Sequence, residues 1–233
     1  MQIEQKEIFG AKFAVVVPAS IGLPRHDTSE FDAHEPCMEG WVADIRPGDV
    51  VIDAGASFGN YTLAAIAKGA RAVCYEPYEE CARILRTNLT VNGWEDLAVI
   101  REVGLWWEGS EPYPQGILAQ LGVPLDMPTV CLDNEMAVLA LADLPATNRV
   151  HIKIDTEGTE LGIIKGALKL IAKYHPKIVI EDHENVNPDP SCEVSHYPER
   201  VESRKNINAI LSGLGYKLEV LPFDVSRHYI VAT

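Results

Sequence analysis

Apolar residues along the chain follow two patterns, one that predicts strands and one that predicts helices. Short runs of β-branched and aromatic residues predict strands, whereas apolar residues three and four positions apart predict helices with one buried face. Residues 2–8 and 12–18 read as two short strands around Phe9-Gly10-Ala11, which is typical of a hairpin. A helix is expected to begin near Pro36. Its buried face would carry Met38, Trp41, Val42 and Ile45.

From residue 50 onward, predicted strands and helices alternate. The predicted strands are 50–54, 70–76, 97–102, 150–155, 178–181, 216–220 and 229–232. The predicted helices are 58–68, 78–92, 158–173 and 203–214. The helix over 78–92 is expected to face inward through Cys81, Ile84, Leu85 and Leu89, and the helix over 158–173 through Leu161, Ile164, Leu168 and Ile171. Nearly all-apolar strands separated by helices form a parallel sheet that helices cover on both faces, so the pattern predicts a doubly wound α/β fold. We expect one globular domain, in which residues 1–45 form an N-terminal hairpin and helix that pack on the core and cover the site, and residues 46–233 form the main domain.

Two stretches, 104–128 and 183–202, interrupt this alternation. Both are rich in proline, and long loops of this kind in a compact domain are often lids or binding loops. The first stretch carries three aromatic residues, Trp106, Trp107 and Tyr113. These side chains could stack on a flat acceptor such as a sugar, or they could anchor the loop to the core.

Composition narrows the classes of partner. The 233-residue chain has a net charge of −14, which argues against a nucleic-acid partner because phosphate binding needs clustered lysine and arginine. Its five cysteines are scattered and form no Cys-x-x-Cys pair, so reduced thiols and a cytoplasmic location are expected. The apolar run 13–17 is too short for a signal peptide or a membrane span. The oligomeric state, including a homo-oligomer, is left open.

The segment Val50 to Tyr61 places small residues where a strand turns into a helix. Within it, Asp53 lies two residues before Gly55, and Gly59 follows four residues later. In open α/β sheets, ligands bind at such strand ends, and glycines let a ligand approach the backbone. The segment has neither the Gly-x-Gly-x-x-Gly of dinucleotide-binding loops nor the Gly-Lys-Ser/Thr of Walker loops. The spacing Asp-x-Gly-x-x-x-Gly resembles the first motif of S-adenosylmethionine-dependent methyltransferases.

Glu76 ends the next predicted strand, 23 residues after Asp53. A carboxylate at this place can accept hydrogen bonds from the two vicinal hydroxyls of a ribose, although it could also be a solvated strand-end residue. For Asp53, two roles stay open: it could touch the ligand, or it could hold the glycine loop through backbone N–H groups.

The most specific motif is His151-Ile-Lys153-Ile-Asp155-Thr-Glu157-Gly158-Thr-Glu160, followed by Lys165-Gly166-Ala. Together with other segments in the same order, it resembles the FkbM family of methyltransferases. These segments are Tyr75-Glu76-Pro77, Asn88 with Asn92 and Gly93, Val130-Cys-Leu-Asp133, and Ile178-Val-Ile-Glu181-Asp-His183. Ser57 departs from the asparagine that is common in the family.

This resemblance implies a Rossmann-like methyltransferase fold, with a mostly parallel seven-stranded sheet and an antiparallel last strand. It also implies S-adenosylmethionine as the methyl donor and an oxygen acceptor on a small molecule, sugar or natural product. The alternatives are an N-methyltransferase, an RNA methyltransferase, a non-catalytic nucleoside-binding protein and a nicotinamide oxidoreductase. The net charge disfavours the RNA enzyme, and the glycine spacing disfavours the oxidoreductase.

The resemblance and the strand ends together give the expected site residues. The expected donor-binding residues are Asp53, Gly55, Ala56, Ser57, Gly59, Asn60, Tyr61, Glu76, Pro77, Val103 and Asp155. The expected catalytic residues are His183, Asp155 and Glu157.

His183 is expected to be the base that removes the proton of an acceptor hydroxyl, since an unperturbed imidazole titrates near neutrality. It could instead cap backbone groups of its loop. Asp155, Glu181 and His183 could also bind one divalent cation, because carboxylates and imidazole suit magnesium or manganese. Lys153 is expected to pair with a carboxylate inside the sheet, since a buried unpaired ammonium is costly.

Overall fold

The structure is a computed structural model that describes residues 2–17, 35–107, 128–138, 149–156, 158–182, 198–222 and 228–233. The chain divides into two compact units. The first unit is Met1–Gly104 with Leu144–Ile152, and the second is Leu105–Asp143 with Lys153–Thr233.

The chain begins with the predicted hairpin. Strands β1 (Gln2–Ile8) and β2 (Ala11–Val17) are antiparallel, with Ile8 opposite Ala11. The turn residues Phe9 and Gly10 both have positive φ, 47° and 79°. This is the combination that a two-residue hairpin turn needs to match the strand twist, so the prediction is confirmed.

Helix α1 (Pro36–Asp44) also follows the prediction. Proline occupies the first turn, where its missing N–H costs no helical hydrogen bond. All four residues expected on its inner face are buried: Met38, Trp41, Val42 and Ile45.

The main sheet has seven strands in the order β10-β11-β9-β8-β3-β4-β5. They are β3 (Val50–Ala54), β4 (Arg71–Tyr75), β5 (Ala98–Arg101), β8 (Val150–Ile154), β9 (Lys177–Asp182), β10 (Leu218–Pro222) and β11 (His228–Ala232). Strands β3, β4 and β5 are parallel, whereas β11 is antiparallel to both β9 and β10. The predicted doubly wound α/β sheet with an antiparallel last strand is therefore confirmed. The order turns back between β3 and β8, and open α/β sheets bind ligands at such a switch point.

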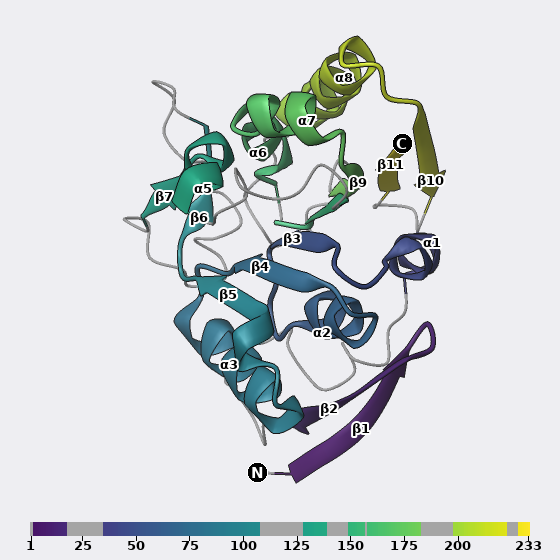
Figure 1. Cartoon of the computed structure of the whole chain (residues 1–233). Helices are drawn as coiled ribbons and strands as arrows, with labels where there is room; N and C mark the ends of the chain where they lie inside the picture. The colour runs from purple at the N-terminus through teal and green to yellow at the C-terminus, as the bar shows by residue number, and fades with distance from the viewer. Residues whose placement is uncertain are drawn as a thin grey trace, which may run out of the picture. The chain divides into compact units, whose positions relative to one another are not determined.

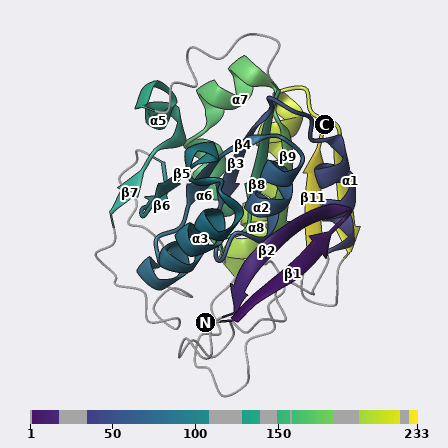
Figure 2. The ribbon, with the colours of Figure 1, turned by 60° about the horizontal axis from the view of Figure 1, so that its bottom comes forward.

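Within the first unit, three layers follow one another (Figures 1 and 2). Helices α2 (Asn60–Ala67) and α3 (Glu79–Asn92) lie between the β1–β2 hairpin and strands β3 to β5. The face of α3 predicted to point inward is buried, through Cys81, Ile84, Leu85 and Leu89. A short 3-10 helix, η2 (Glu95–Leu97), precedes β5. The loop from β3 to α2 is thus attached to two packed helices and a strand.

The second unit contains the remaining elements. A short pair, β6 (Gly104–Leu105) with β7 (Thr129–Val130), precedes helix α5 (Leu132–Val138). Helices α6 (Glu160–Lys165), α7 (Leu168–Tyr174) and α8 (Pro198–Gly213) follow. Helix α8 begins at Pro198 rather than at the predicted residue 203. No helix in the described part of the chain is long and apolar enough to cross a membrane.

The prediction of one helix over residues 158–173 is wrong, because the helix is broken at Gly166-Ala167. The Asp133 side chain accepts hydrogen bonds from the backbone N–H groups of Lys169, at 3.0 Å, and Leu170, at 2.8 Å. These groups lie in the first turn of α7, so a carboxylate from α5 caps this helix. Leu168, which was expected to be buried, is 39% exposed, whereas Leu170 and Ile171 are buried.

Candidate functional site

The glycine loop joins β3 to α2 in a conformation that most residues avoid. Gly55, Ser57 and Gly59 have positive φ values of 77°, 49° and 95°. Glycine adopts such values without strain, whereas a serine there needs support from its surroundings. A Cβ at Gly59 would also lie 2.3 Å from Cδ1 of Leu85 in α3. The loop therefore depends on glycine both for its turn and for its packing on α3.

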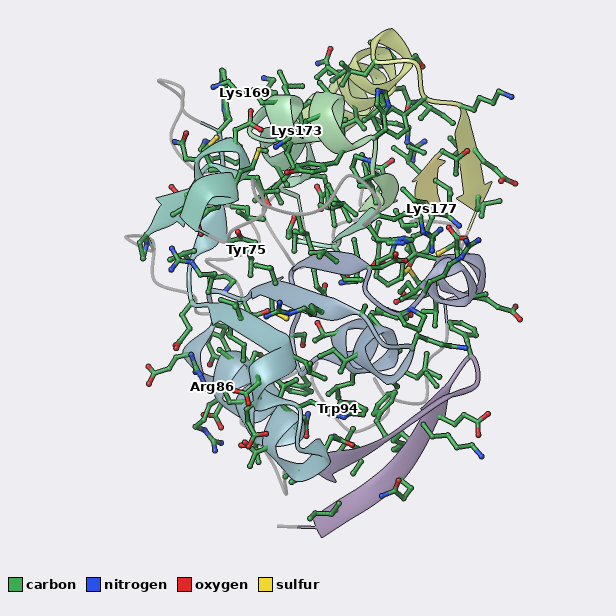
Figure 3. All side chains as sticks on the ribbon, in the orientation of Figure 1. Tyr75, Arg86, Trp94, Lys169, Lys173 and Lys177 are labelled. Carbon is green, nitrogen blue, oxygen red and sulfur yellow. The ribbon has the colours of Figure 1, made fainter. Side chains whose placement is uncertain are left out.

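Glu76 fastens this loop to the end of β4. Its Oε2 accepts the backbone N–H of Ser57 at 2.8 Å, and its Oε1 accepts the N–H of Tyr78 at 2.9 Å. The carbonyl of Tyr75, which ends β4 (Figure 3), accepts the N–H groups of Gly55 at 2.9 Å and Ala56 at 3.3 Å. Glu76 is only 7% exposed, so it is not the solvated strand-end carboxylate that was the alternative. Carboxylate oxygens are strong acceptors of hydrogen bonds from hydroxyl groups such as those of a ribose.

Asp53 contacts helix α2. Its Oδ2 accepts the hydroxyl proton of Thr62 at 2.7 Å, and the Asp53 side chain is buried. This bond joins the end of β3 to the first turns of α2, on the other side of the glycine loop. This contact with a helix side chain adds to the two roles, ligand contact and support of the loop backbone, that the sequence left open.

Tyr61 lies in the first turn of α2 and is almost fully buried. Its hydroxyl donates a 2.5 Å hydrogen bond to the carboxylate of Glu35, the residue that precedes α1. Burial and the neighbouring Glu35 carboxylate raise the pKa of Tyr61 well above its ordinary value. Tyr61 therefore stays protonated and acts as a donor to Glu35.

The first unit thus brings together most of the residues expected to bind the donor. The loop residues Ala56 and Asn60, and the neighbours Pro77 and Val103 beyond β4 and β5, all belong to it. Asp155 belongs to the second unit, and Glu157 lies outside the described residues.

In the second unit, Asp155 follows β8 directly. The ammonium of Lys153, which is buried, lies 3.3 Å from Oδ2 of Asp155, which confirms the expected carboxylate partner of this lysine. Glu160 accepts the N–H of Gly158 at 2.8 Å, and the hydroxyl of Thr159 donates to that of Thr156 at 2.7 Å. These bonds hold the turn that leads into α6.

Of the expected cation ligands, Asp155 and Glu181 are described, and Glu181 is buried in β9. His183 lies outside the described residues. Among the residues that are described, no group of three His, Cys, Asp or Glu side chains is arranged to hold a metal ion.

Trp106 anchors its loop to α6. Its backbone N–H donates to the carbonyl of Val130, and a Cβ at Gly162 would lie 2.1 Å from Cζ3 of its ring. The neighbouring Trp107 ring has the Lys165 ammonium 4.5 Å from its centroid. The anchoring alternative therefore holds for Trp106, while Tyr113 lies outside the described residues.

A partly buried cluster of ionisable side chains at the beginnings of β3 and β8 was not predicted. Oδ2 of Asp49 accepts hydrogen bonds from the Arg149 guanidinium at 2.7 Å and from Nε2 of His151 at 2.9 Å. Burial lowers the pKa of His151, although Asp49 opposes this shift. Burial alone would raise the pKa of Asp49, but the hydrogen bonds from the Arg46 N–H, His151 and Arg149 hold it below its ordinary value. The sequence signal that could have indicated this cluster is the presence of charged residues, Asp49 and Arg149, directly before two apolar strands.

Comparison with known proteins agrees with this geometry. The family described as "Methyltransferase FkbM domain" matches residues 53–218. No curated protein matches the chain. Among solved structures, the chain is similar to a methyltransferase FkbM from Methylobacillus flagellatus KT, with 18% sequence identity and a TM-score of 0.56. That alignment covers 84% of this chain and 46% of the other, so this chain spans less than half the length of that relative.

A second similar structure is an O-methyltransferase from Bacillus cereus in complex with SAH. It has 17% sequence identity and a TM-score of 0.52, and the alignment covers 91% of this chain and 84% of that protein. At these identities the two structures show the shared Rossmann-like methyltransferase fold, and the family match covers most of the chain, including the glycine loop and Glu76. The chain therefore belongs to the FkbM family and is an S-adenosylmethionine-dependent methyltransferase.

Proposed function

We propose that the enzyme transfers the methyl group of S-adenosylmethionine to a hydroxyl oxygen of a small molecule or glycan. The FkbM family match and the likeness to an O-methyltransferase from Bacillus cereus support an oxygen acceptor. The net charge of −14 supports an acceptor other than a nucleic acid. A cytoplasmic location is proposed as well, and it agrees with the free thiols of Cys37, Cys74, Cys81 and Cys131.

The observation that carries the proposal is the attachment of Glu76 to the glycine loop. Backbone N–H groups of Ser57 and Tyr78 fix its carboxylate at the end of β4, the strand next to β3. A carboxylate at the end of this strand fits the ribose of the donor, because the acidic residue that follows the second strand of such folds accepts hydrogen bonds from vicinal ribose hydroxyls. The first turn of α2 fits the donor's carboxylate, since helix N-termini bind anions.

We assign donor binding to the residues predicted for it: Asp53, Gly55, Ala56, Ser57, Gly59, Asn60, Tyr61, Glu76, Pro77, Val103 and Asp155. When bound, the donor supplies an electrophilic methyl carbon on a sulfonium. In the structure, Asp53 and Tyr61 contact Thr62 and Glu35 respectively, so their proposed contribution is to shape the site.

The acceptor oxygen forms a bond to the methyl carbon while the carbon–sulfur bond breaks, which yields a methyl ether and S-adenosylhomocysteine. The acceptor's proton goes to a base, and we assign this role to His183, with Asp155 and Glu157 as acidic neighbours that orient the acceptor. A cation held by Asp155, Glu181 and His183 is the alternative way to lower the acceptor's pKa.

The experiment is to supply the enzyme with carbon-13 methyl-labelled S-adenosylmethionine and fractionated metabolites and glycans. The carbon chemical shift of the transferred methyl group separates O-methyl products from N-methyl and C-methyl products. We expect an O-methyl signal that is lost in His183→Ala and is insensitive to a chelator. An N-methyl signal, or incorporation into RNA alone, would replace the proposed acceptor, and inhibition by chelator would favour the cation.

A further inference from the structure

The residues that precede the family match are linked to the glycine loop through two intermediate residues, Asn88 of α3 and Tyr61 of α2. We propose that this N-terminal segment, residues 2–17 and Glu35, is a positioning part of the donor site: the hairpin acts through Asn88, and Glu35 acts through Tyr61, to hold the glycine loop in its binding conformation. The inference rests on the proposed function, in which this loop binds the methyl donor.

The first route begins at the outer edge of β2. The backbone of Ala14 exchanges two hydrogen bonds with the Asn92 amide, at 2.8 and 2.7 Å, and the Val16 N–H donates to Oδ1 of Asn88 at 2.7 Å. Helix α3 therefore presents two side-chain amides where a further strand would otherwise pair. Figures 1 and 2 show the hairpin lying along α2 and α3.

Asn88 continues this route to the glycine loop. Its Nδ2 donates a 2.9 Å hydrogen bond to the carbonyl of Phe58, which lies between Ser57 and Gly59. The Asn88 side chain is fully buried, so exchanging the oxygen and nitrogen of its amide would leave buried groups without suitable partners. The hydrogen bond from the Val16 N–H holds the Asn88 amide oxygen toward β2. The amide nitrogen of Asn88 therefore points toward the glycine loop.

The second route is the Tyr61–Glu35 pair. Tyr61 follows the loop directly in the first turn of α2, and its hydroxyl donates to Glu35 at 2.5 Å. The backbone N–H of Glu35 lies 3.5 Å from the same hydroxyl oxygen. Glu35, which precedes α1, is thereby hydrogen-bonded to α2, the helix that follows the glycine loop.

The loop needs such support because of its backbone. Ser57, with a φ of 49°, lies in a region that residues other than glycine populate at a cost. If these contacts are lost, only a fraction of the protein molecules has the loop in its binding conformation. The apparent Kd for the donor then equals the intrinsic Kd divided by that fraction. Loss of this support is therefore expected to weaken donor binding. This effect is separate from the loss of stability that follows the replacement of any buried amide side chain.

The test compares Asn88→Ala with Asn92→Ala. Both variants remove an amide that holds β2 to α3, but only Asn88 reaches the glycine loop. The measurements are the melting temperature and the Kd for S-adenosylhomocysteine by titration calorimetry. Both variants are expected to melt earlier. Asn88→Ala is expected to raise the Kd about tenfold, whereas Asn92→Ala changes it by less than about twofold.

A second pair tests the other route and does not depend on the folding of Asn88→Ala. Glu35→Ala is expected to raise the same Kd about fivefold, and Glu39→Ala, which removes an exposed carboxylate of α1, to leave it unchanged. Equal Kd values within both pairs would overturn the inference. Glu76→Ala serves as the reference: if it binds S-adenosylhomocysteine as the wild type does, the proposed donor site is wrong. If it binds weakly while the two pairs show no difference, only the role of the N-terminal segment is wrong.

Discussion

Gly162 in α6 packs against the ring of Trp106 so closely that no larger residue fits. A Cβ at this position would lie 2.1 Å from Cζ3 and 2.2 Å from Cε3 of the ring. Trp106 as a whole cannot easily move away, because its backbone N–H is bonded to Val130 and its carbonyl lies 2.8 Å from where a Cβ of Gly166 would be. Gly162→Ala therefore forces the indole or α6 to shift.

Two opposing effects set the size of the change. Replacing a helical glycine by alanine stabilises a helix by about 0.5–1 kcal/mol. Overpacking a tight contact costs about 1–3 kcal/mol. The net loss lies between about 0 and 2.5 kcal/mol, so we expect Gly162→Ala to lower the free energy of unfolding by about 1 kcal/mol.

Gly40 provides the matched control, because it lies in helix α1 and a Cβ there would meet nothing within 4 Å. In urea unfolding followed by circular dichroism, Gly40→Ala should raise the free energy of unfolding by about 0.5–1 kcal/mol. Adding Trp106→Leu should make Gly162→Ala neutral or stabilising, since the ring is then absent. If Gly162→Ala stabilises the protein as much as Gly40→Ala does, Trp106 does not pack on Gly162 and its anchoring role is refuted.

Two further predictions concern stability. Asp133→Ala removes the carboxylate that caps α7 and should lower the free energy of unfolding by about 1–2 kcal/mol, with Asp133→Asn in between; equal stabilities of all three proteins in urea would contradict the capping role. The second prediction is acid sensitivity. Because the pKa of His151 is lowered in the folded state, its contribution is complete above pH 6.5, the value of a free histidine, and is lost as the pH falls below it. Between pH 7.5 and 5.5 this loss is at most about 1.4 kcal/mol and should be absent in His151→Gln. The pKa of Asp49 is also lowered, so its contribution is present above pH 3.8 and is lost as the pH falls through the lowered value. Parallel stability profiles of the wild type and His151→Gln would contradict the assignment to His151.

Local signals in the sequence predicted much of the fold. The Phe9-Gly10 turn, Pro36 in the first turn of α1 and the inward face of α3 each depend on neighbours within a few residues. The spacing of apolar residues and the residue types found in turns depend on such neighbours, so these features can be recognised in the sequence. The hairpin, α1 and the seven strands of the main sheet were accordingly predicted correctly, whereas β6, β7 and α5 were not predicted.

The break between α6 and α7 could not be predicted in this way. Apolar residues at 161, 164, 168 and 171 continue one helical period through Gly166. The cause of the break lies elsewhere in the chain, in the Asp133 side chain that caps α7 and in the Trp106 backbone that presses on Gly166. A tertiary contact therefore overrides a regular local pattern.

For the candidate site, the sequence indicated candidate residues but not how their side chains are held. Glu76 was predicted from its place at a strand end, but its bonds to Ser57 and Tyr78 depend on the positive φ of the loop. Asn88 was noticed only as part of a family resemblance. Its bond to Phe58 joins residues 30 apart, and no local pattern reports it.

The central claim is that Glu76 holds the ribose of the methyl donor. Its most direct test is a thermodynamic cycle by titration calorimetry, with S-adenosylhomocysteine and its 2′-deoxy analogue as ligands and the wild type and Glu76→Ala as proteins. In the wild type, loss of the hydroxyl should raise the Kd about 10- to 100-fold, because a hydrogen bond to a charged group is lost. In Glu76→Ala, the same loss should change the Kd by less than about threefold. An equal penalty in both proteins would show that Glu76 does not bind the ribose.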